Sequence, residues 1–237
     1  MKNVFLETGN VSRFEAAMGV LRDTDAGQPG LGVVWGRAGR GKTMAARRHA
    51  VSNRAVYLRA LQDETPTAML SRLCGELVKI DGATPRTASA AKTMACGLLD
   101  KSKRPVLVDE ADRLKMPLVE HLRDIHDLTG VPVVFVGEDS LWPMLNSKRR
   151  IWSRVTQAVE FGPVTSEDVM LYASKAAGLS LAPEAALALE QRSEGDFRLL
   201  HRDMAALSRM AKTARIHEVS ADMIQALPSL NGGRHGR

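Results

Sequence analysis

The chain has 237 residues, of which 44% are hydrophobic and 25% charged, a composition that is ordinary for folded proteins and excludes disorder on a large scale. The formal net charge of +6 allows a polyanionic partner such as nucleic acid. Aromatic residues make up only 4% of the chain, which argues against a single-strand-binding surface built from exposed rings.

The first residues, MKNVFLETGNVSRF, contain no apolar segment long enough for a signal peptide. No later segment approaches the roughly 20 apolar residues of a membrane span. We therefore expect a cytoplasmic protein that does not contact a membrane. Cys74 and Cys96 stand apart from each other, without a CxxC pair or a His cluster, so reduced cysteines in helices are expected instead of a disulfide or a metal site.

The first two thirds of the chain alternate between helical and strand patterns. Residues 10–22 are expected to form a helix, and Ser12 and Glu15 have the spacing of a capping box at its start. The loop DTDAGQPG is expected to end this helix. Strands are expected at 31–36, 55–60, 104–112, 131–137 and 156–160, and further helices at 42–51, 65–80, 87–102 and 117–130, with a turn at 81–85. This alternation predicts a parallel sheet that helices cover on both faces.

The pattern changes after residue 163. From residue 166 to 227 only helices are expected, at 166–178, 182–195, 196–213 and 220–227. The end, NGGRHGR, is rich in glycine and basic residues, which is typical of a frayed terminus. We predict an α/β core over residues 1–163, a helical lid domain over 164–229 and a flexible basic tail over 230–237.

A phosphate-binding loop lies between the first expected strand and its helix. The stretch GRAGRGKT fits the pattern G-x-x-x-x-G-K-[ST], in which glycines let backbone N–H groups curl around phosphates at the positive end of a helix. The pattern predicts that Lys42 reaches the β- and γ-phosphates of ATP and that Thr43 binds Mg²⁺. The residues expected to bind the nucleotide are Gly36, Arg37, Ala38, Gly39, Arg40, Gly41, Lys42, Thr43, Met44, Asp109 and Arg198.

The second half of the expected site is VLVDE, in which a buried strand runs directly into Asp109 and Glu110. We expect Asp109 to hold the metal through a water molecule and Glu110 to orient and deprotonate the attacking water, so that ATP is hydrolysed. The next strand ends in Glu138, which should lie beside Glu110 if the two strands are neighbours. A carboxylate there would repel Glu110 or require a proton or a cation, and the alternative is that Glu138 points elsewhere.

Arginines follow in two later stretches. SKRRIWSRV contains Arg149, Arg150 and Arg154, and EGDFR contains Arg198. An arginine that is delivered late in phosphoryl transfer stabilises the charge on the γ-phosphate oxygens. Arg154 suits delivery into the site of a neighbouring subunit, with Arg149 and Arg150 as competitors, and Arg198 suits delivery from the lid of the same chain. A solvated surface position is the alternative for each of them.

Taken in this order, the phosphate loop, VDEAD, SRV and GDFR resemble an AAA+ ATPase with a P-loop core of five parallel strands and a C-terminal helical lid. The stretches VPVVFVGEDSLWPML, RRIWSRVTQAVEFGPVTSEDV and SEGDFRLL look most like the phage Mu B-type and related transposition ATPases. The resemblance covers about residues 5–228. It implies that Lys42 and Thr43 are the Walker A residues, Asp109 and Glu110 the Walker B pair, Arg154 the arginine finger and Arg198 the sensor 2 arginine.

The resemblance also implies partners. Such proteins form ATP-dependent rings or helical filaments on double-stranded DNA, deliver target DNA to a transposase that they stimulate, and lose the DNA on hydrolysis. This chain departs from the pattern at the sensor 1 position, where Glu138 replaces the usual Asn, Thr or Ser. By its length the chain is also expected to lack room for the N-terminal helix-turn-helix domain of the phage Mu protein, so DNA contacts are expected from the core or the tails.

Contact with the phosphate backbone of DNA requires only basic groups in the right place and carries no sequence information. An ordinary solvated face explains any single basic residue equally well, and we expect Arg47, Arg48 and His49, on the helix behind the loop, to form a partly solvated face. The DNA-binding candidates are Arg86, Lys92, Lys101, Lys103, Arg104, Arg113 and Lys115.

The leading hypothesis is an ATP-dependent, non-sequence-specific DNA-binding regulator of transposition. One alternative keeps the fold and changes the client, as in an AAA+ initiator or loader, or a secretion-type ATPase, that remodels a protein partner. A second is a nucleotide-occupied scaffold with little turnover, which Glu138 suggests. A small-molecule kinase is disfavoured because VDEAD indicates an activated water.

Overall fold

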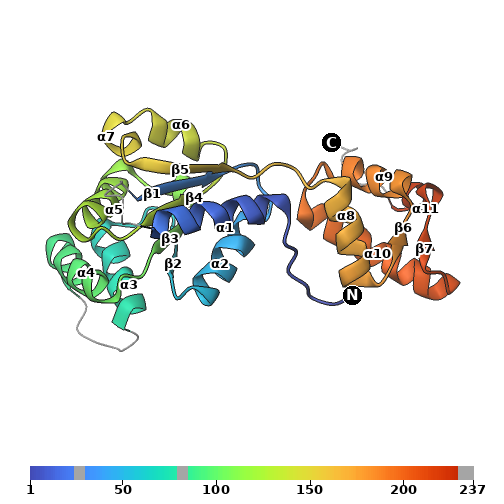
Figure 1. Cartoon of the computed structure of the whole chain (residues 1–237), viewed down its shortest axis with the longest axis horizontal. Coiled ribbons are helices and arrows are strands. Elements are labelled where there is room, and N and C mark those ends of the chain that lie inside the picture. Colours follow the sequence, from blue (N-terminus) through green and yellow to red (C-terminus); the bar gives the residue numbers. More distant parts are fainter. Residues whose placement is uncertain (24–29, 79–84, 229–237) are drawn as a thin grey trace, which may run out of the picture. The chain divides into compact units, whose positions relative to one another are not determined.

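The computed structural model describes residues 1–23, 30–78 and 85–228 (Figure 1). The chain divides into two compact units, one of Gly9–Phe161 and one of Met1–Thr8 together with Gly162–Arg237. Most of the expected loop at 23–30, most of the turn at 81–85 and the whole expected tail at 230–237 lie outside the described residues.

The first unit is built on a five-stranded sheet with the order β2-β3-β4-β1-β5, and every neighbouring pair is parallel. The strands are β1 (Leu31–Trp35), β2 (Val56–Arg59), β3 (Val106–Asp109), β4 (Val133–Val136) and β5 (Val155–Glu160). The α/β class and the five-stranded parallel sheet predicted from the sequence are confirmed. In a parallel sheet all carboxyl ends meet at one edge, so the segments after β1, β3 and β4 lie together.

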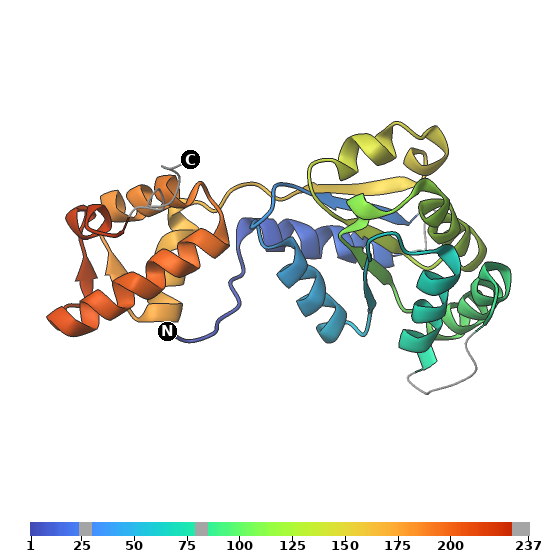
Figure 2. The ribbon, with the colours of Figure 1, turned by 180° about the vertical axis from the view of Figure 1, so that it is seen from behind.

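Successive side chains of each strand point to opposite faces of this sheet, and helices cover both faces. Leu31 pairs in register with Val133 and Val33 with Phe135, and these four side chains belong to the core formed with α3 (Pro66–Val78), α4 (Ala88–Ser102) and α5 (Met116–Thr129). Figure 2 shows these three helices, coloured from teal to green, packed against one another. The helices α1 (Gly9–Arg22) and α2 (Lys42–Ser52) contact the same sheet through other positions.

The start of α1 differs from the expected capping box. The helix begins at Gly9, so Ser12 lies inside its first turn and does not cap it. Glu15 instead places Oε2 2.8 Å from Nδ1 of His49 on α2. His49 is 2% exposed and is therefore part of the packing between α1 and α2, whereas Arg47 and Arg48 are solvated as expected.

Two short helices that the sequence patterns did not predict lead into β5. They are α6 (Leu141–Asn146) and α7 (Arg149–Trp152). Trp142 on α6 stacks on Trp35 at the end of β1, with ring centroids 4.2 Å apart, and meets Trp152 on α7 edge-on at 4.5 Å. Aromatic contacts of this kind fix the segment that carries the three arginines before β5.

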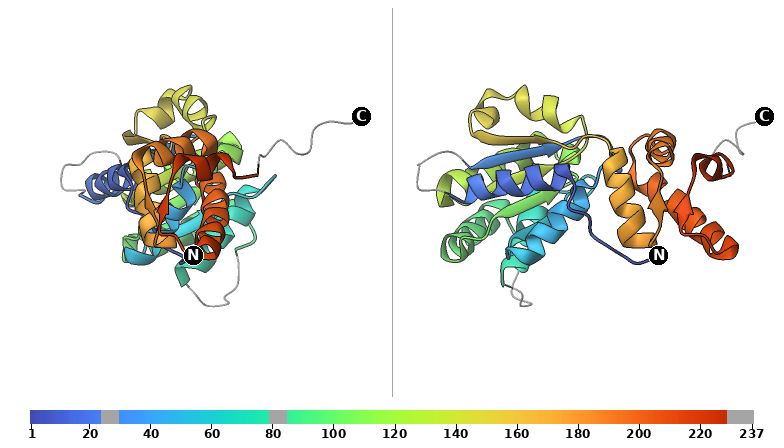
Figure 3. Two further views of the ribbon diagram at one scale, coloured as in Figure 1. Left: turned by 90° about the vertical axis from the view of Figure 1, so that its right-hand side faces the viewer. Right: turned by 45° about the vertical axis from the view of Figure 1, so that its right-hand side comes forward.

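The second unit is mainly helical (Figure 3). Its helices are α8 (Ser166–Tyr172), which continues into a π-helical turn at Ala173–Ala177, α9 (Pro183–Ser193), α10 (Phe197–Ala214) and α11 (Ala221–Gln225). The expectation of helices alone was wrong in one respect, because β6 (Ser180–Leu181) and β7 (Glu218–Val219) form a parallel pair. Two residues are too few to show the alternation that identifies a strand in a sequence.

The first eight residues belong to this second unit, whereas the sequence boundaries placed them in the α/β core. The backbone N–H of Lys2 donates to the carbonyl of Ala176 at 2.7 Å, and Leu6 is buried in the apolar cluster of the second unit. Burial of Leu6 accounts for this placement, since the segment has too few residues to form a core of its own. In the described part of the chain, no helix combines the length and the apolar character that crossing a bilayer requires.

Candidate active site

The phosphate loop connects the buried end of β1 to the start of α2 and depends on its glycines. Gly36, Gly39 and Gly41 have φ angles of 143°, 77° and 94°, which residues other than glycine rarely adopt. A Cβ at Gly36 would also lie 2.4 Å from the carbonyl oxygen of Phe161. The loop therefore brings its backbone close to the first turn of α2, where N–H groups without intrahelical partners point out of the helix.

Lys42 lies inside this loop. Its side chain is 8% exposed, and Nζ donates to the carbonyl oxygens of Gly36 at 2.5 Å and Arg37 at 2.8 Å. Burial lowers the pKa of Lys42, while nearby acids, of which Glu138 has the largest influence, act to raise it. The ammonium group is thus held by loop carbonyls at the mouth of the helix, and anionic phosphate oxygens are stronger acceptors for it.

Asp109 and Glu110 stand at the carboxyl end of β3, as the sequence predicts, and each has specific partners. Asp109 is 2% exposed, and its Oδ1 accepts from the backbone N–H of Glu110 at 3.0 Å. Its Oδ2 accepts from the hydroxyl of Tyr57 at 2.6 Å. Burial and this hydrogen bond raise the pKa of Tyr57 to about 12, so the phenol stays a donor at neutral pH.

Glu110 adopts a left-handed backbone conformation with φ 55° and makes two ion pairs. Arg59 at the end of β2 pairs with its Oε1, and Arg113 places Nη1 2.7 Å from its Oε2. The carboxylate of the expected general base is therefore held by two guanidinium groups of its own chain. A left-handed residue at this point is a strained feature of the kind that occurs at functional sites.

Sequence reasoning missed Tyr57 and Arg59. They are two residues apart on β2, so they lie on one face of the strand, and β2 is the edge strand next to β3. The sequence pattern that could have identified them is Tyr-x-Arg, two polar side chains at alternate positions of β2, the strand beside the one that ends in Asp109. Only the strand order makes that alternation meaningful.

Glu138 follows β4, and β4 is the neighbour of β3, which is the condition under which we expected it near Glu110. Its backbone N–H donates to Oδ1 of Asp112 at 2.9 Å, and its side chain is exposed. A Cβ at Gly137 would lie 2.4 Å from the same oxygen, so Asp112 packs closely against this turn. The negative charge of Glu138 acts to raise the pKa of Lys42 in the phosphate loop, against the larger effect of burial.

Two of the three arginines before β5, Arg150 and Arg154, contact acids of α5 in the same chain. Arg154 donates through Nε to both carboxylate oxygens of Asp127, at 2.7 and 3.0 Å, and through Nη1 to the carbonyl of Arg150. Arg150 pairs with Glu120 at 3.3 Å and is largely exposed. Arg198 lies in the second unit, in the first turn of α10, where its backbone N–H donates to the capping residue Asp196.

Residues 24–145, just over half of the chain, match the family model described as an AAA domain. The chain belongs to the AAA domain family. The phosphate loop, Asp109 and Glu110 all lie within the matched segment, and this is a type of domain that binds ATP together with Mg²⁺.

Among related proteins, a potential ATP-binding protein of Staphylococcus aureus is 26% identical over 129 residues, which are 51% of this chain and 48% of that protein. The Mu-like prophage FluMu DNA transposition protein B of Haemophilus influenzae is 26% identical over 181 residues, 72% of this chain and 62% of that protein. The AAA chain thus spans about half and just under two thirds of these two relatives.

The ATP-dependent target DNA activator B of Escherichia phage Mu is 25% identical over 227 residues, which are 90% of this chain and 70% of that protein. The resemblance to Mu B-type transposition ATPases is confirmed by these relatives.

Solved structures share the fold of the AAA chain. The Aeropyrum pernix ORC2 protein, solved as ADPNP-ADP complexes, has a TM-score of 0.67 at 15% identity and covers 94% of this chain and 68% of that one. The Thermotoga maritima RuvB Holliday junction branch migration motor has a TM-score of 0.58 at 16% identity, over 92% of this chain and 68% of that one. These identities are low enough that the likeness shows the AAA fold alone.

The residues present fit a magnesium nucleotide. Mg²⁺ prefers oxygen ligands and usually keeps several waters while it binds one or two protein groups and the substrate phosphates. The hydroxyl of Thr43 is a ligand of this kind, and the buried carboxylate of Asp109 is an acceptor for a water molecule on the metal. Within residues 1–23, 30–78 and 85–228, no group of three or more His, Cys, Asp or Glu side chains is placed to hold a metal ion.

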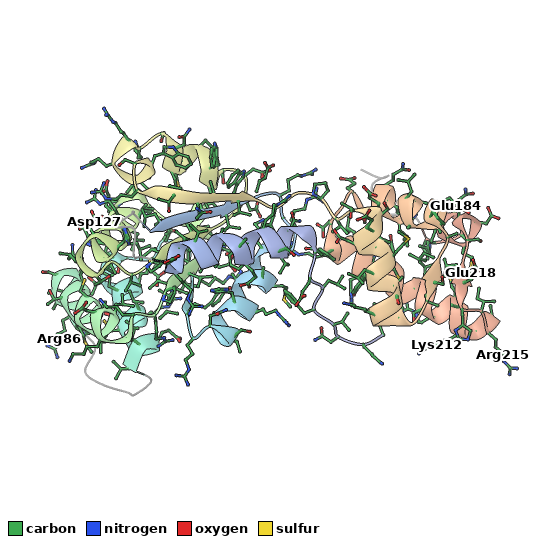
Figure 4. All side chains as sticks on the ribbon, viewed as in Figure 1. Arg86, Asp127, Glu184, Lys212, Arg215 and Glu218 are labelled. Atoms are coloured by element: carbon green, nitrogen blue, oxygen red, sulfur yellow. The ribbon has the colours of Figure 1, made fainter. Side chains whose placement is uncertain are left out.

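Most of the basic residues that we expected at DNA have other partners in this AAA chain. Arg113 pairs with Glu110, Lys92 with Asp124, Lys103 with Asp100 and Lys115 with Asp63. Arg104 donates to the backbone carbonyls of Arg54, Ala55 and Glu76, which ties β2 to α3. Arg86 and Lys101 are exposed, and Arg86 lies at an outer edge of the first unit (Figure 4).

Proposed function

We propose that this ATPase binds the phosphate backbone of duplex DNA while ATP is bound, assembles on that DNA as a ring or helical filament, and delivers it to a transposase that it stimulates. The observation that carries the proposal is the extent of the similarity to target DNA activator B of phage Mu, which reaches 90% of the chain. The basic net charge of +6 is consistent with a DNA partner.

In this proposal each half of the site has a separate task. The amides of the phosphate loop and Lys42 bind the phosphates. Thr43 directly, and Asp109 through a water molecule, would hold Mg²⁺, which would supply positive charge beside the phosphates. Glu110 orients the attacking water and accepts its proton. Arg198 of the same chain and Arg154 of a neighbouring subunit stabilise the charge that develops on the γ-phosphate.

Two sets of ion pairs within one chain restrain this chemistry. Arg59 and Arg113 hold Glu110, and Asp127 holds Arg154. Each must be exchanged before hydrolysis, since a carboxylate held by two guanidinium groups is not free to orient a water and a paired guanidinium is not available to a phosphate. DNA phosphates compete for Arg59 and Arg113, and the γ-phosphate of a neighbouring subunit competes for Arg154. ATP turnover is therefore expected to depend on assembly and on DNA, in the cytoplasm of the bacterial host.

The proposal is tested by ATP turnover with and without duplex DNA, combined with negative-stain electron microscopy. We expect DNA to stimulate hydrolysis and filaments or rings to appear only with ATP. Images that show monomers alone, with both ATP and duplex DNA present, contradict the proposal.

Two other outcomes identify the alternatives. Turnover that DNA leaves unchanged, but that a protein partner stimulates, indicates an AAA+ initiator, loader or secretion-type ATPase. The third possibility, a nucleotide-occupied scaffold, predicts low turnover that Glu138→Asn raises strongly, since an uncharged group then stands at the end of β4.

A further inference from the structure

We infer that Tyr57 is a positioning residue for the metal-binding carboxylate of Asp109, and that Arg47 on the phosphate-loop helix holds Tyr57 in that position. The inference rests on the proposed nucleotide site and assigns it two residues that the phosphate loop and the acidic pair do not include. Three contacts carry it, and they run from α2 through β2 to the end of β3.

The first contact fixes one oxygen of Asp109. The hydroxyl of Tyr57 donates to Oδ2 at 2.6 Å, while Oδ1 accepts from the backbone N–H of Glu110. One donor on each oxygen determines the rotation of a carboxylate. Because an ionised carboxylate has about four lone-pair sites, a metal-bound water can still donate to Asp109 without displacing Tyr57.

The other two contacts hold Tyr57 from the opposite side. The guanidinium carbon of Arg47 lies 5.3 Å from the centroid of the Tyr57 ring, and Nε donates to the Tyr57 hydroxyl at 3.2 Å. Arg47 thus binds both the face and the oxygen of the same side chain. A cation over a ring and a donor on its hydroxyl both restrict the rotation of the phenol.

Arg47 lies on the same helix as the expected metal ligand Thr43. Arg47 follows Thr43 by four residues on α2, so the two side chains lie on one face of the helix. Thr43 and Asp109 come from different elements but must hold one metal ion together. The contacts from Arg47 through Tyr57 to Asp109 join the helix that carries Thr43 to the strand that carries Asp109.

A purely structural role for Tyr57 is distinguished by removing only its hydroxyl. Tyr57→Phe keeps the ring and its packing on β2 and deletes the hydrogen bonds to Asp109 and Arg47. Removing partners that orient metal ligands typically costs about 10- to 100-fold in metal affinity. A structural role predicts a change in unfolding temperature with the metal affinity unchanged.

The experiment measures the binding of a fluorescent ATP analogue to the full chain in EDTA and across a Mg²⁺ titration. In EDTA we expect Tyr57→Phe to bind the analogue with the same affinity as wild type. In the Mg²⁺ titration we expect the variant to need about tenfold more Mg²⁺ to reach half of the gain in affinity that magnesium produces. Arg47→Met should move the midpoint in the same direction by a smaller factor. A Tyr57→Phe titration that matches wild type, or that shifts to lower Mg²⁺, overturns the inference.

Two controls separate this inference from the proposed nucleotide site itself. Tyr172→Phe makes the same chemical change at the other tyrosine, which bonds to His201 at 2.5 Å in the second unit, and should leave the titration at wild type. In an Asp109→Asn background, adding Tyr57→Phe should have no further effect, because the two residues act through one contact. If wild type itself shows no magnesium-dependent gain in affinity, the proposed nucleotide site fails, whereas an unaltered Tyr57→Phe beside a responsive wild type overturns only the inference.

Discussion

Arg154 donates to both carboxylate oxygens of Asp127 in its own chain, at 2.7 and 3.0 Å. One N–H shared between two carboxylate oxygens is a bifurcated contact, and the side chains of both residues are about one third exposed, so a competing anion can reach them. The proposed role of Arg154 in a neighbouring site therefore requires an exchange of Asp127 for phosphate. That exchange makes assembly part of the catalytic cycle.

Mixing two inactive variants tests whether Arg154 acts on a neighbouring subunit. Glu110→Gln lacks the general base and Arg154→Ala lacks the finger, and each should lower turnover by at least about a hundredfold. In mixed oligomers, a subunit with Arg154→Ala keeps an intact site that a Glu110→Gln neighbour completes. Random mixing completes about one interface in four, so we expect a mixture to recover roughly a quarter of wild-type turnover.

The matched control uses Arg198→Ala with Glu110→Gln. Because Arg198 is proposed to act on its own chain, each site in that mixture lacks one group and no activity should return. The same mixing with Arg149→Ala and Arg150→Ala identifies the finger among the three arginines. If Arg154→Ala mixtures stay inactive while either of the others recovers, the finger is that residue and Asp127 merely anchors Arg154.

Replacing Arg59 should release the general base. We expect Arg59→Ala to raise turnover in the absence of DNA by about two- to fivefold, because it removes one of the two ion pairs on Glu110, and to reduce the further stimulation by DNA. Steady-state turnover with and without duplex DNA measures both effects. Arg22→Ala, which removes an exposed arginine bonded to Asn53, serves as the control. A fall in turnover without DNA would show that Arg59 supports Glu110 instead of restraining it.

The DNA-binding candidates of the first unit should fall into two groups, one that stabilises the fold and one that does not. Arg104→Ala should lower the free energy of unfolding by about 1–3 kcal/mol, because three backbone carbonyls lose their charged donor. The double variant Arg86→Ala, Lys101→Ala should keep wild-type stability, since both side chains are exposed.

If Arg86 and Lys101 contact DNA, the double variant also lowers the slope of log affinity against log salt by about two. Fluorescence anisotropy with duplex DNA over a range of salt measures this slope. An unchanged slope removes both residues from the proposed interface.

Gly36 should tolerate no side chain. Gly36→Ala places a Cβ 2.4 Å from the carbonyl oxygen of Phe161 and at a φ of 143°, so we expect a loss of about 1–3 kcal/mol in the free energy of unfolding and a loss of ATP binding. Gly75→Ala is the matched control, because its Cβ meets nothing within 4 Å in helix α3 and should stabilise the chain slightly. Chemical denaturation and ATP binding measure the two variants, and equal stabilities would refute the role of the glycine.

The sequence was sufficient for the sheet and for placing the phosphate loop after β1 and Asp109 and Glu110 at the end of β3, because these placements depend on local patterns. The phosphate loop is a fixed spacing of glycines before Lys42, and Asp109 ends an apolar run that must be a buried strand. Partners from other elements could not be predicted. Arg59 and Tyr57 reach the acids only because β2 lies beside β3, and Asp127 meets Arg154 only because α5 packs near the segment before β5. The same limit applied to the basic residues, since whether Lys92 is free depends on Asp124, 32 residues away.

The central claim is that ATP controls the binding of this chain to duplex DNA, and a mobility-shift titration tests it most directly. Wild type and Lys42→Ala are titrated onto one duplex of mixed sequence without nucleotide, with ADP and with ATP, at one fixed salt concentration. We predict that wild type shifts the duplex only when ATP is present, and that Lys42→Ala shifts it under none of the three conditions. A shift that is equal with and without ATP, or no shift of wild type with ATP, would contradict the claim.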